Sequence, residues 1–242
     1  MTILCIETST SVCSAAVCKN GSLIRQCMSL EGSNHARLLP RYIEELLSYA
    51  REQALCIDAV ALSEGPGSYT GLRIGTSTAK GICYGLNIPL IPIPTLEILC
   101  EGARAGLEAS GEILADAILL PMIDARRMEV YTAFYSAETK GERVAAKAVV
   151  VENEESLTND QSPLTNDRSV YYFGDGAAKC STVFMKPNWH YVPGIVPEAR
   201  YMGRIAESGE RLTVSGEQIA YYEPYYLKEF VAAQSHVKGL KS

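Results

Sequence analysis

The most constraining feature of this sequence is a pattern of apolar runs and helical segments that occurs twice along the chain. In the first half, apolar runs at residues 2–8, 12–20 and 22–30 are separated by short polar turns, which predicts three strands. Asn20 and Gly21 both tolerate the positive φ that a type I′ turn requires. The second and third strands are therefore predicted to pair antiparallel.

The remainder of the first half alternates helix and strand. Apolar residues recur at steps of three and four over residues 33–54, which predicts an amphipathic helix with Ser33 as its N-cap. Pro40 should either kink this helix or mark its first turn. The resulting order of three strands followed by alternating helices and strands predicts a mixed sheet with helices on its faces. The further segments are a strand at 58–65, a helix at 70–87, a strand at 88–94 and a helix at 95–107.

After Gly111 the pattern restarts, so the 242 residues are predicted to form two related lobes. The division we expect is a first lobe at 1–105, a second lobe at 106–228 and a loose tail at 229–242. The second lobe has predicted strands at 118–125, 128–136, 143–151 and 170–176, a polar surface excursion at 152–169, and helices at 177–185 and 198–212.

Composition narrows the classes of function. A hydrophobic fraction of 47% is typical of a globular protein with a proper core. A net charge of −6 opposes direct, autonomous binding of RNA or DNA, because phosphate backbones are repelled. No stretch approaches the roughly 18 apolar residues of a membrane span, and no basic region precedes the first apolar run. We therefore expect a soluble, cytoplasmic protein without a membrane partner.

Metal and disulfide chemistry find little support in the sequence. The eight cysteines include no CxxC pair and mostly lie in apolar runs, as reduced, buried thiols do. The three histidines, His35, His190 and His236, have no zinc-ligand spacing. We expect no metal and no cofactor.

The segment from Ser63 to Gly75, SEGPGSYTGLRIG, is a glycine-rich turn that opens a helix. It is neither a P-loop, since no Lys followed by Ser or Thr comes after the glycines, nor a dinucleotide fingerprint, since Thr70 occupies the third glycine position. An anion at the helix N-terminus remains open.

Just downstream, Gly71, Gly75, Ala79 and Cys83 recur every four residues and form one stripe of small residues. Because each glycine costs about 1 kcal/mol of helix stability, another element should pack closely on this stripe. That element is either the protein's own sheet or helix, or a helix of a partner protein.

Acidic residues end several predicted strands. These are Glu7, Glu64, Asp124 and Asp175. Such carboxylates either contact a nucleotide in a cleft between the lobes or cap backbone turns. Glu7, Thr8 and Asp124 are the candidate cofactor contacts.

Four stretches resemble the TsaB (YeaZ) family of bacterial proteins: ILCIETSTSVCSAAV, LSEGPGSYTGLRIGTSTAKGI, MIDARRMEVYTAFY and FGDG. The resemblance covers most of the first half and two landmarks of the second. It implies an α/β fold of two actin- and Hsp70-ATPase-like lobes (the ASKHA, RNase H-like fold), each a mixed sheet with flanking helices.

The resemblance also implies a comparison with TsaD, the catalytic sister subunit, whose metal site is an HxEGH motif. The corresponding run here is Thr95 to Leu99, in which both histidine positions are lost and the acid is kept as Glu97. A hydroxyl and an isobutyl group do not replace two imidazoles as metal ligands. The resemblance therefore implies a noncatalytic chain.

What the resemblance implies about function is a scaffold that binds TsaD, with TsaE joining, for threonylcarbamoylation of tRNA adenosine 37. The tRNA is reached only through the complex, and a homodimer forms when TsaD is absent. The alternatives are an independent enzyme that binds and hydrolyses nucleotide, or a glycoprotease-like peptidase. The implied partner-binding residues, on the first two helices, are His35, Leu39, Tyr42, Ile43, Gly71, Leu72, Arg73, Gly75, Thr76, Ala79 and Cys83.

Overall fold

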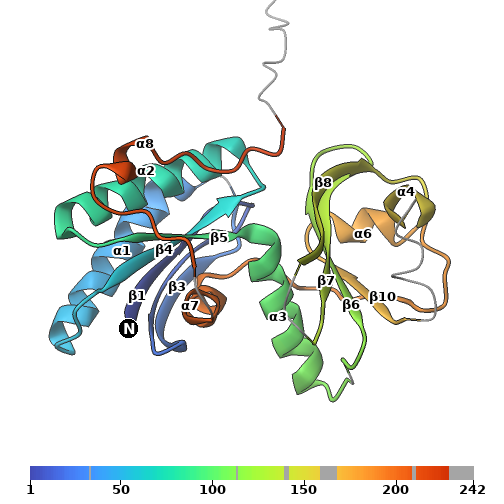
Figure 1. The fold of residues 1–242 in the computed structure, drawn as a ribbon, viewed down its shortest axis with the longest axis horizontal. Coiled ribbons are helices and arrows are strands. Elements are labelled where there is room, and N and C mark those ends of the chain that lie inside the picture. Colours follow the sequence, from blue (N-terminus) through green and yellow to red (C-terminus); the bar gives the residue numbers. More distant parts are fainter. Residues whose placement is uncertain (33, 113, 139–141, 159–167, 209–210, 229–242) are drawn as a thin grey trace, which may run out of the picture.

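The protein forms two five-stranded sheets with helices on their faces, as seen in a computed structural model that describes residues 1–32, 34–112, 114–138, 142–158, 168–208 and 211–228 (Figure 1). The first sheet contains β1 (Thr2–Glu7), β2 (Cys13–Lys19), β3 (Ser22–Ser29), β4 (Ala59–Gly65) and β5 (Leu90–Pro94). The second contains β6 (Ile118–Asp124), β7 (Glu129–Ser136), β8 (Glu142–Val150), β9 (Val170–Phe173) and β10 (Trp189–Tyr191). The helices are α1 (His35–Glu52), α2 (Tyr69–Leu86), α3 (Thr95–Ala109), α4 (Glu155–Thr158), α6 (Ala177–Cys180), α7 (Ala199–Glu207) and α8 (Gln218–Tyr221).

The first sheet has the predicted mixed topology, in the order β3-β2-β1-β4-β5. β1 pairs antiparallel with β2 and parallel with β4. The predicted hairpin is confirmed, since Asn20 and Gly21 have φ of 50° and 72° and connect antiparallel β2 and β3. β1 is buried along its whole length, because helices cover both faces of the sheet.

The second sheet repeats this order as β10-β9-β6-β7-β8, with β6 in the place of β1. β6 pairs antiparallel with β7 and parallel with β9, as β1 does with β2 and β4. The predicted repetition of the first half by the second is therefore confirmed. The element bounds differ in detail: α6 ends at Cys180, β9 ends at Phe173 and α7 ends at Glu207, each earlier than predicted. The surface excursion contains the short helix α4.

The helices form layers around the two sheets (Figure 1). α1 and α2 cover one face of the first sheet, over a core that includes Leu4, Ile6, Leu39 and Leu62. α7 covers the other face, and α3 lies between the two sheets (Figure 1). Among the described residues, no helix combines the length and apolar character that crossing a bilayer requires.

The C-terminal part of the chain returns to the first lobe. Buried residues of α7 pack with Ile3, Cys5 and Cys18 of the first sheet, and Val214 pairs with Leu90 of β5. α8 packs beside α2 (Figure 1). The predicted division at residue 105 therefore differs from the structure, since α3 runs through that position and residues 199–221 pack with the first sheet rather than the second.

The start of α1 also differs from the prediction. The helix begins at His35 after Asn34, whose side chain makes no capping hydrogen bond. Ser33, the predicted N-cap, lies outside the described residues. Pro40 lies inside the helix and does not mark its first turn.

Candidate functional site

The glycine-rich turn before α2 packs against the chain's own β1–β2 connection. Ser68 caps α2, because its hydroxyl accepts a hydrogen bond from the Gly71 amide at 3.3 Å. A Cβ atom at Gly67 would overlap the Ser9 carbonyl oxygen, and one at Gly71 would overlap that of Thr8. The Thr8 hydroxyl also donates to the Gly71 carbonyl at 2.8 Å. The glycines therefore allow two backbone segments of this one chain to approach closely.

The small-residue stripe faces inward, which makes its interpretation as a partner surface wrong. Gly71, Gly75, Ala79 and Cys83 are all buried by the chain's own atoms. A Cβ at Gly75 would overlap the Thr8 hydroxyl and lie 3.2 Å from Leu62 Cδ1. The own-sheet alternative is thus the correct one, and Leu72 and Thr76 are buried on the same side of α2.

Most of the remaining residues implied for partner binding are also buried. Leu39 and Ile43 belong to the core of the first lobe, and His35 is buried with its Nε2 3.0 Å from the Val12 carbonyl oxygen. Tyr42 is half-buried, and Arg73 is exposed. Of the implied set, only Tyr42 and Arg73 reach the surface of the isolated chain.

A second row of small residues, on the opposite side of the helix from the buried stripe, forms the outward face of α2. Thr70, Ser77, Gly81 and Gly85 are exposed. A Cβ at Gly81 or Gly85 would meet no described atom within 4 Å outside the neighbouring backbone of α2 itself. The sequence signal for this row is the spacing of seven, four and four residues between its members, which is as helical as the spacing of the buried stripe.

A groove of about 500 Å³ lies between this face and α1. Ala36 and Pro40 line it from α1, and Thr70, Arg73, Ile74 and Ser77 are among the residues that line it from α2. Because these side chains are mostly short, the backbone of another molecule can come close to both helices. We call the groove and the exposed row of α2 the α1–α2 face.

The candidate cofactor residues Glu7 and Thr8 lie at the buried end of β1. Glu7 Oε1 accepts hydrogen bonds from the Ser9 amide at 2.6 Å and the Ser9 hydroxyl at 2.5 Å, while Oε2 has no partner. Burial raises the pKa of Glu7 to about 7, against the opposing effect of the hydrogen bonds from Ser9. Both Glu7 and Thr8 are fully buried, and the α2 glycines lie over Thr8.

Asp124, the third candidate, occupies the matching position at the end of β6 in the second lobe. Its carboxylate pairs with Lys179, and its amide donates to Asp175 at 2.9 Å. These contacts fix the end of the strand, as the turn-capping alternative predicts. No contact between Glu7 and Asp124 is present among the described residues.

The run that corresponds to the TsaD metal motif lies at the start of α3. Thr95 and Leu99 are buried, and the Glu97 carboxylate pairs with Arg211, whose Nη1 lies 2.9 Å from Oε2. In the part of the chain that the structure describes, no three His, Cys, Asp or Glu side chains group as metal ligands would.

Comparison with known proteins agrees with this architecture. A family model described as TsaD, tRNA N6-adenosine threonylcarbamoyltransferase, matches residues 29–231. The match and the paired sheets define the class, a two-lobed α/β protein related to that transferase. Within the class, the chain belongs to the TsaB (YeaZ) family.

Relatives and solved structures support that assignment over nearly the whole length. The tRNA threonylcarbamoyladenosine biosynthesis protein TsaB of Haemophilus influenzae is 30% identical over 237 residues, which are 96% of this chain and 95% of that protein. The Escherichia coli protein of the same name is 33% identical over 58% of each chain. The structure of YeaZ from Pseudomonas aeruginosa has a TM-score of 0.70 at 25% identity and covers 93% of this chain and 99% of its own.

Proposed function

We propose that this protein is a noncatalytic subunit in the biosynthesis of tRNA threonylcarbamoyladenosine, and that it binds TsaD through the α1–α2 face. The observation that carries the proposal is the exposed glycine row of α2. Gly81 and Gly85 weaken the helix by about 1 kcal/mol each, and a Cβ at either position would meet no other described element of the chain within 4 Å. Close approach of a second polypeptide explains why no larger residue fills this space.

In this proposal the chemistry takes place on TsaD, and TsaE completes the assembly. The position of the TsaD metal motif is occupied here by Thr95 and Leu99, and Glu97 is held in an ion pair with Arg211. With a net charge of −6, this chain meets tRNA only as part of the complex. We place the protein in the cytoplasm, together with its tRNA substrate.

The proposal is tested by steric blocking of the α1–α2 face. A Cβ at Gly81 meets no other described element within 4 Å, so Gly81→Leu should fold, and its side chain should fill the close-approach position and abolish co-purification with TsaD. Gly106→Leu on α3 is the matched control, because Gly106 is also an exposed helical glycine with only an ordinary 3.7 Å contact to Ile195. A variant at Gly75 is not suitable, since any Cβ there disrupts the contact with Thr8.

Two measurements are read together: capture of TsaD and formation of the modified adenosine on tRNA by the reconstituted proteins. We expect Gly81→Leu to abolish both and Gly106→Leu to leave both at the wild-type level. Intact capture and modification with Gly81→Leu contradict the proposed interface. Modified adenosine formed by this chain without TsaD contradicts the noncatalytic role.

The same face supports a homodimer when TsaD is absent, because exposed apolar surface, here with Pro40 and Ile74 in the groove, tends to self-associate. Size-exclusion chromatography at two loadings should show a dimer that increases with concentration and disappears when TsaD is added. Gly81→Leu should remain monomeric at both loadings.

The alternative of an independent nucleotide hydrolase has less support, since Glu7 and Thr8 are buried beneath the α2 glycines. ATP turnover by the purified wild-type chain, lost in Asp124→Ala, is the result that would favour it.

A further inference from the structure

Arg73 is a cation without an acidic partner at the α1–α2 face. It lines the groove from α2 and is exposed. Its guanidinium donates a hydrogen bond to the Tyr69 hydroxyl at 3.0 Å and lies 5.3 Å from the centre of that ring. Among the described residues, no carboxylate pairs with Arg73, although nine ion pairs are formed elsewhere.

Two further arginines lie on α1, next in sequence to residues that line the groove. Arg37 and Arg41 are exposed on α1, beside the groove-lining residues Ala36 and Pro40, and neither pairs with a carboxylate in the described part of the chain. Glu44 is the acidic residue of α1 nearest along the helix to Arg41, and Glu45 pairs with Arg25 instead. The arginines on this part of α1 and α2 therefore lack a described carboxylate partner, and Glu223, which is exposed beside Tyr226, is an acidic residue of the adjoining C-terminal segment.

The orientation of Arg73 is held by the C-terminal segment. The ring of Tyr226 lies 5.0 Å from the ring of Tyr69, so Tyr226, Tyr69 and Arg73 form a row of contacts that ends at the groove. Stacking of this kind restricts a guanidinium while leaving its outer N–H groups available.

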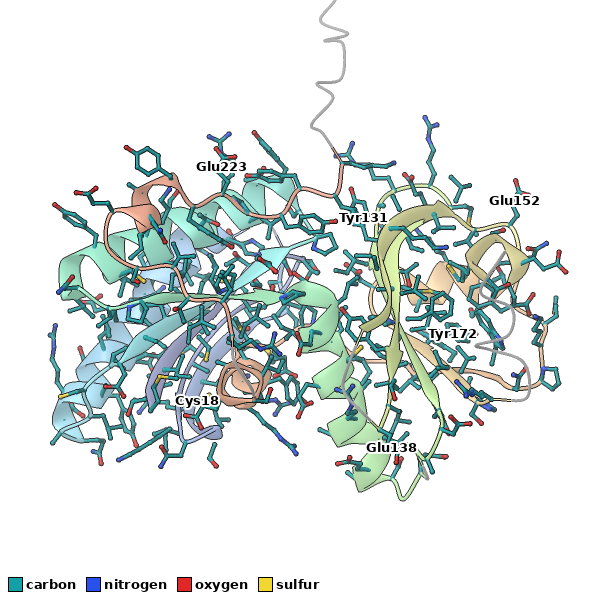
Figure 2. The ribbon with its side chains drawn as sticks, in the orientation of Figure 1. Cys18, Tyr131, Glu138, Glu152, Tyr172 and Glu223 are labelled. Atoms are coloured by element: carbon teal, nitrogen blue, oxygen red, sulfur yellow. The ribbon has the colours of Figure 1, made fainter. Side chains whose placement is uncertain are left out.

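Backbone hydrogen bonds fix the C-terminal segment on α2 and β4. The Tyr225 amide donates to the Glu64 carbonyl at 2.7 Å. Lys80 of α2 donates to the carbonyls of Ala220 and Tyr222 at 2.6 and 3.0 Å. The segment runs along α2 toward the second lobe (Figure 1), and Glu223 marks its path in Figure 2. We call residues 222–228 the strap.

We propose that Arg73 binds a carboxylate on an acidic helix of the partner protein, and that the strap positions Arg73 for this contact through Tyr226 and Tyr69. The proposal rests on the proposed function, because the partner is the protein that docks on the α1–α2 face. It adds the chemistry of recognition, which is a guanidinium–carboxylate pair formed only in the complex.

An acidic protein fits this face better than the other candidate occupants. A second copy brings a further unpaired Arg73 and no matching carboxylate to the face, so the homodimer should be weaker than the complex with TsaD and should give way to it. RNA would need several phosphate contacts, whereas Ile74 and the short side chains of Thr70 and Ser77 offer an apolar and neutral surface to a helix. Charge complementarity therefore favours a partner helix that places a carboxylate against Arg73 and a small apolar side chain against Ile74.

The test measures the affinity of the full-length chain for purified TsaD at low and high salt. Arg73→Ala should weaken binding about 10-fold and Arg73→Glu about 100-fold, and the salt dependence of the wild-type affinity should be reduced in Arg73→Ala. Lys19→Glu is the matched charge reversal, at the end of β2 and away from α2, and it should leave the affinity unchanged. Circular dichroism verifies that each variant is folded.

The role of the strap has its own readout. Tyr226→Phe keeps the ring contact with Tyr69 and should bind as the wild type does. Tyr226→Ala removes this ring contact and should weaken binding to TsaD several-fold. The effect should appear only in a chain that retains Arg73. An equal effect of Tyr226→Ala in the Arg73→Ala background overturns the positioning role.

The proposed contact can be tested directly by chemical cross-linking of the Arg73→Lys variant to TsaD. A carbodiimide joins the lysine amine to an adjacent carboxylate as an amide and is itself converted to a urea. We expect a cross-link from position 73 to an Asp or Glu of TsaD. Binding of Arg73→Glu within 3-fold of the wild type, while Gly81→Leu abolishes binding, overturns this inference and leaves the proposed function intact. Unchanged TsaD affinity with weaker tRNA binding by the complex also overturns it, in favour of a phosphate contact.

Discussion

At the residue scale, Glu7 is a carboxyl group held in the core of the first lobe. It is fully buried, and only one of its oxygens accepts hydrogen bonds. Burial raises its pKa from 4.5 to about 7. The folded chain therefore binds a proton more tightly than the unfolded chain, so the contribution of Glu7 to stability is full below pH 4.5 and is lost as the pH rises through about 7.

This sign leads to a prediction for Glu7→Gln. Gln keeps an oxygen that can accept a hydrogen bond from Ser9, and it carries no charge. The free energy of unfolding of the variant should therefore change less between pH 5 and 8 than that of the wild type. The wild type should lose about 3 kcal/mol relative to the variant over that range. Urea unfolding at pH 5 and pH 8 measures the difference. A wild-type curve that is flat with pH, or that rises relative to Glu7→Gln, contradicts the assignment.

At the element scale, α2 shows where local sequence patterns suffice and where they do not. The helix and the hairpin at Asn20 and Gly21 were predicted, because capping, periodicity and turn chemistry are local properties. The side of α2 that faces the sheet was not predicted, because short residues occupy both the inward and the outward row of the helix. Only the contacts of Gly71 and Gly75 with Thr8 decide which row is buried.

α7 illustrates the same limit. Residues 198–212 were predicted as a helix of the second lobe, but a helix's hydrophobic face does not specify which sheet it packs on. The deciding contact is steric: Gly203 lies directly on Cys18 of β2, whose position under α7 is visible in Figure 2. The sequence contains no local signal for a contact between residues 185 positions apart.

The contact between Gly203 and Cys18 gives a prediction about how α7 packs on β2. A Cβ at Gly203 would overlap Cys18, so Gly203→Ala should destabilise the protein by about 1–3 kcal/mol through overpacking. Gly81→Ala, which adds the same methyl group to α2 in open space, should instead stabilise by about 0.5–1 kcal/mol. Chemical denaturation measures the free energy of unfolding of both variants relative to the wild type. Equal effects in both would mean that α7 does not pack on β2 through Gly203.

At the scale of the whole molecule, a buried arginine joins the two lobes. Arg104 of α3 is 3% exposed and donates to the carbonyls of Ser136 and Ala137 at 2.9 and 3.0 Å, at the end of β7. It also pairs with Glu101 at 3.2 Å, and Glu101 pairs with Arg204 of α7. The repeated order of the sheets was predictable from the strand pattern, but this junction was not, because it depends on where the second sheet sits against α3.

Arg104→Met should loosen this junction while keeping the size of the side chain. It removes the donors to the carbonyls of Ser136, the last residue of β7, and Ala137, which follows it, and it removes one partner of a buried carboxylate, which should cost about 3–5 kcal/mol. Arg204→Met is the control, because the Arg204 side chain is 63% exposed and its ion pair should contribute less than about 1 kcal/mol.

The single tryptophan, Trp189, is buried in the second lobe and reports on that lobe, whereas far-ultraviolet circular dichroism reports on both. In the wild type the two urea transitions should coincide, because α3 is part of the core on both sides. In Arg104→Met the two transitions should separate. Coincident transitions in the variant, even at reduced stability, would mean that apolar packing of α3 alone couples the lobes.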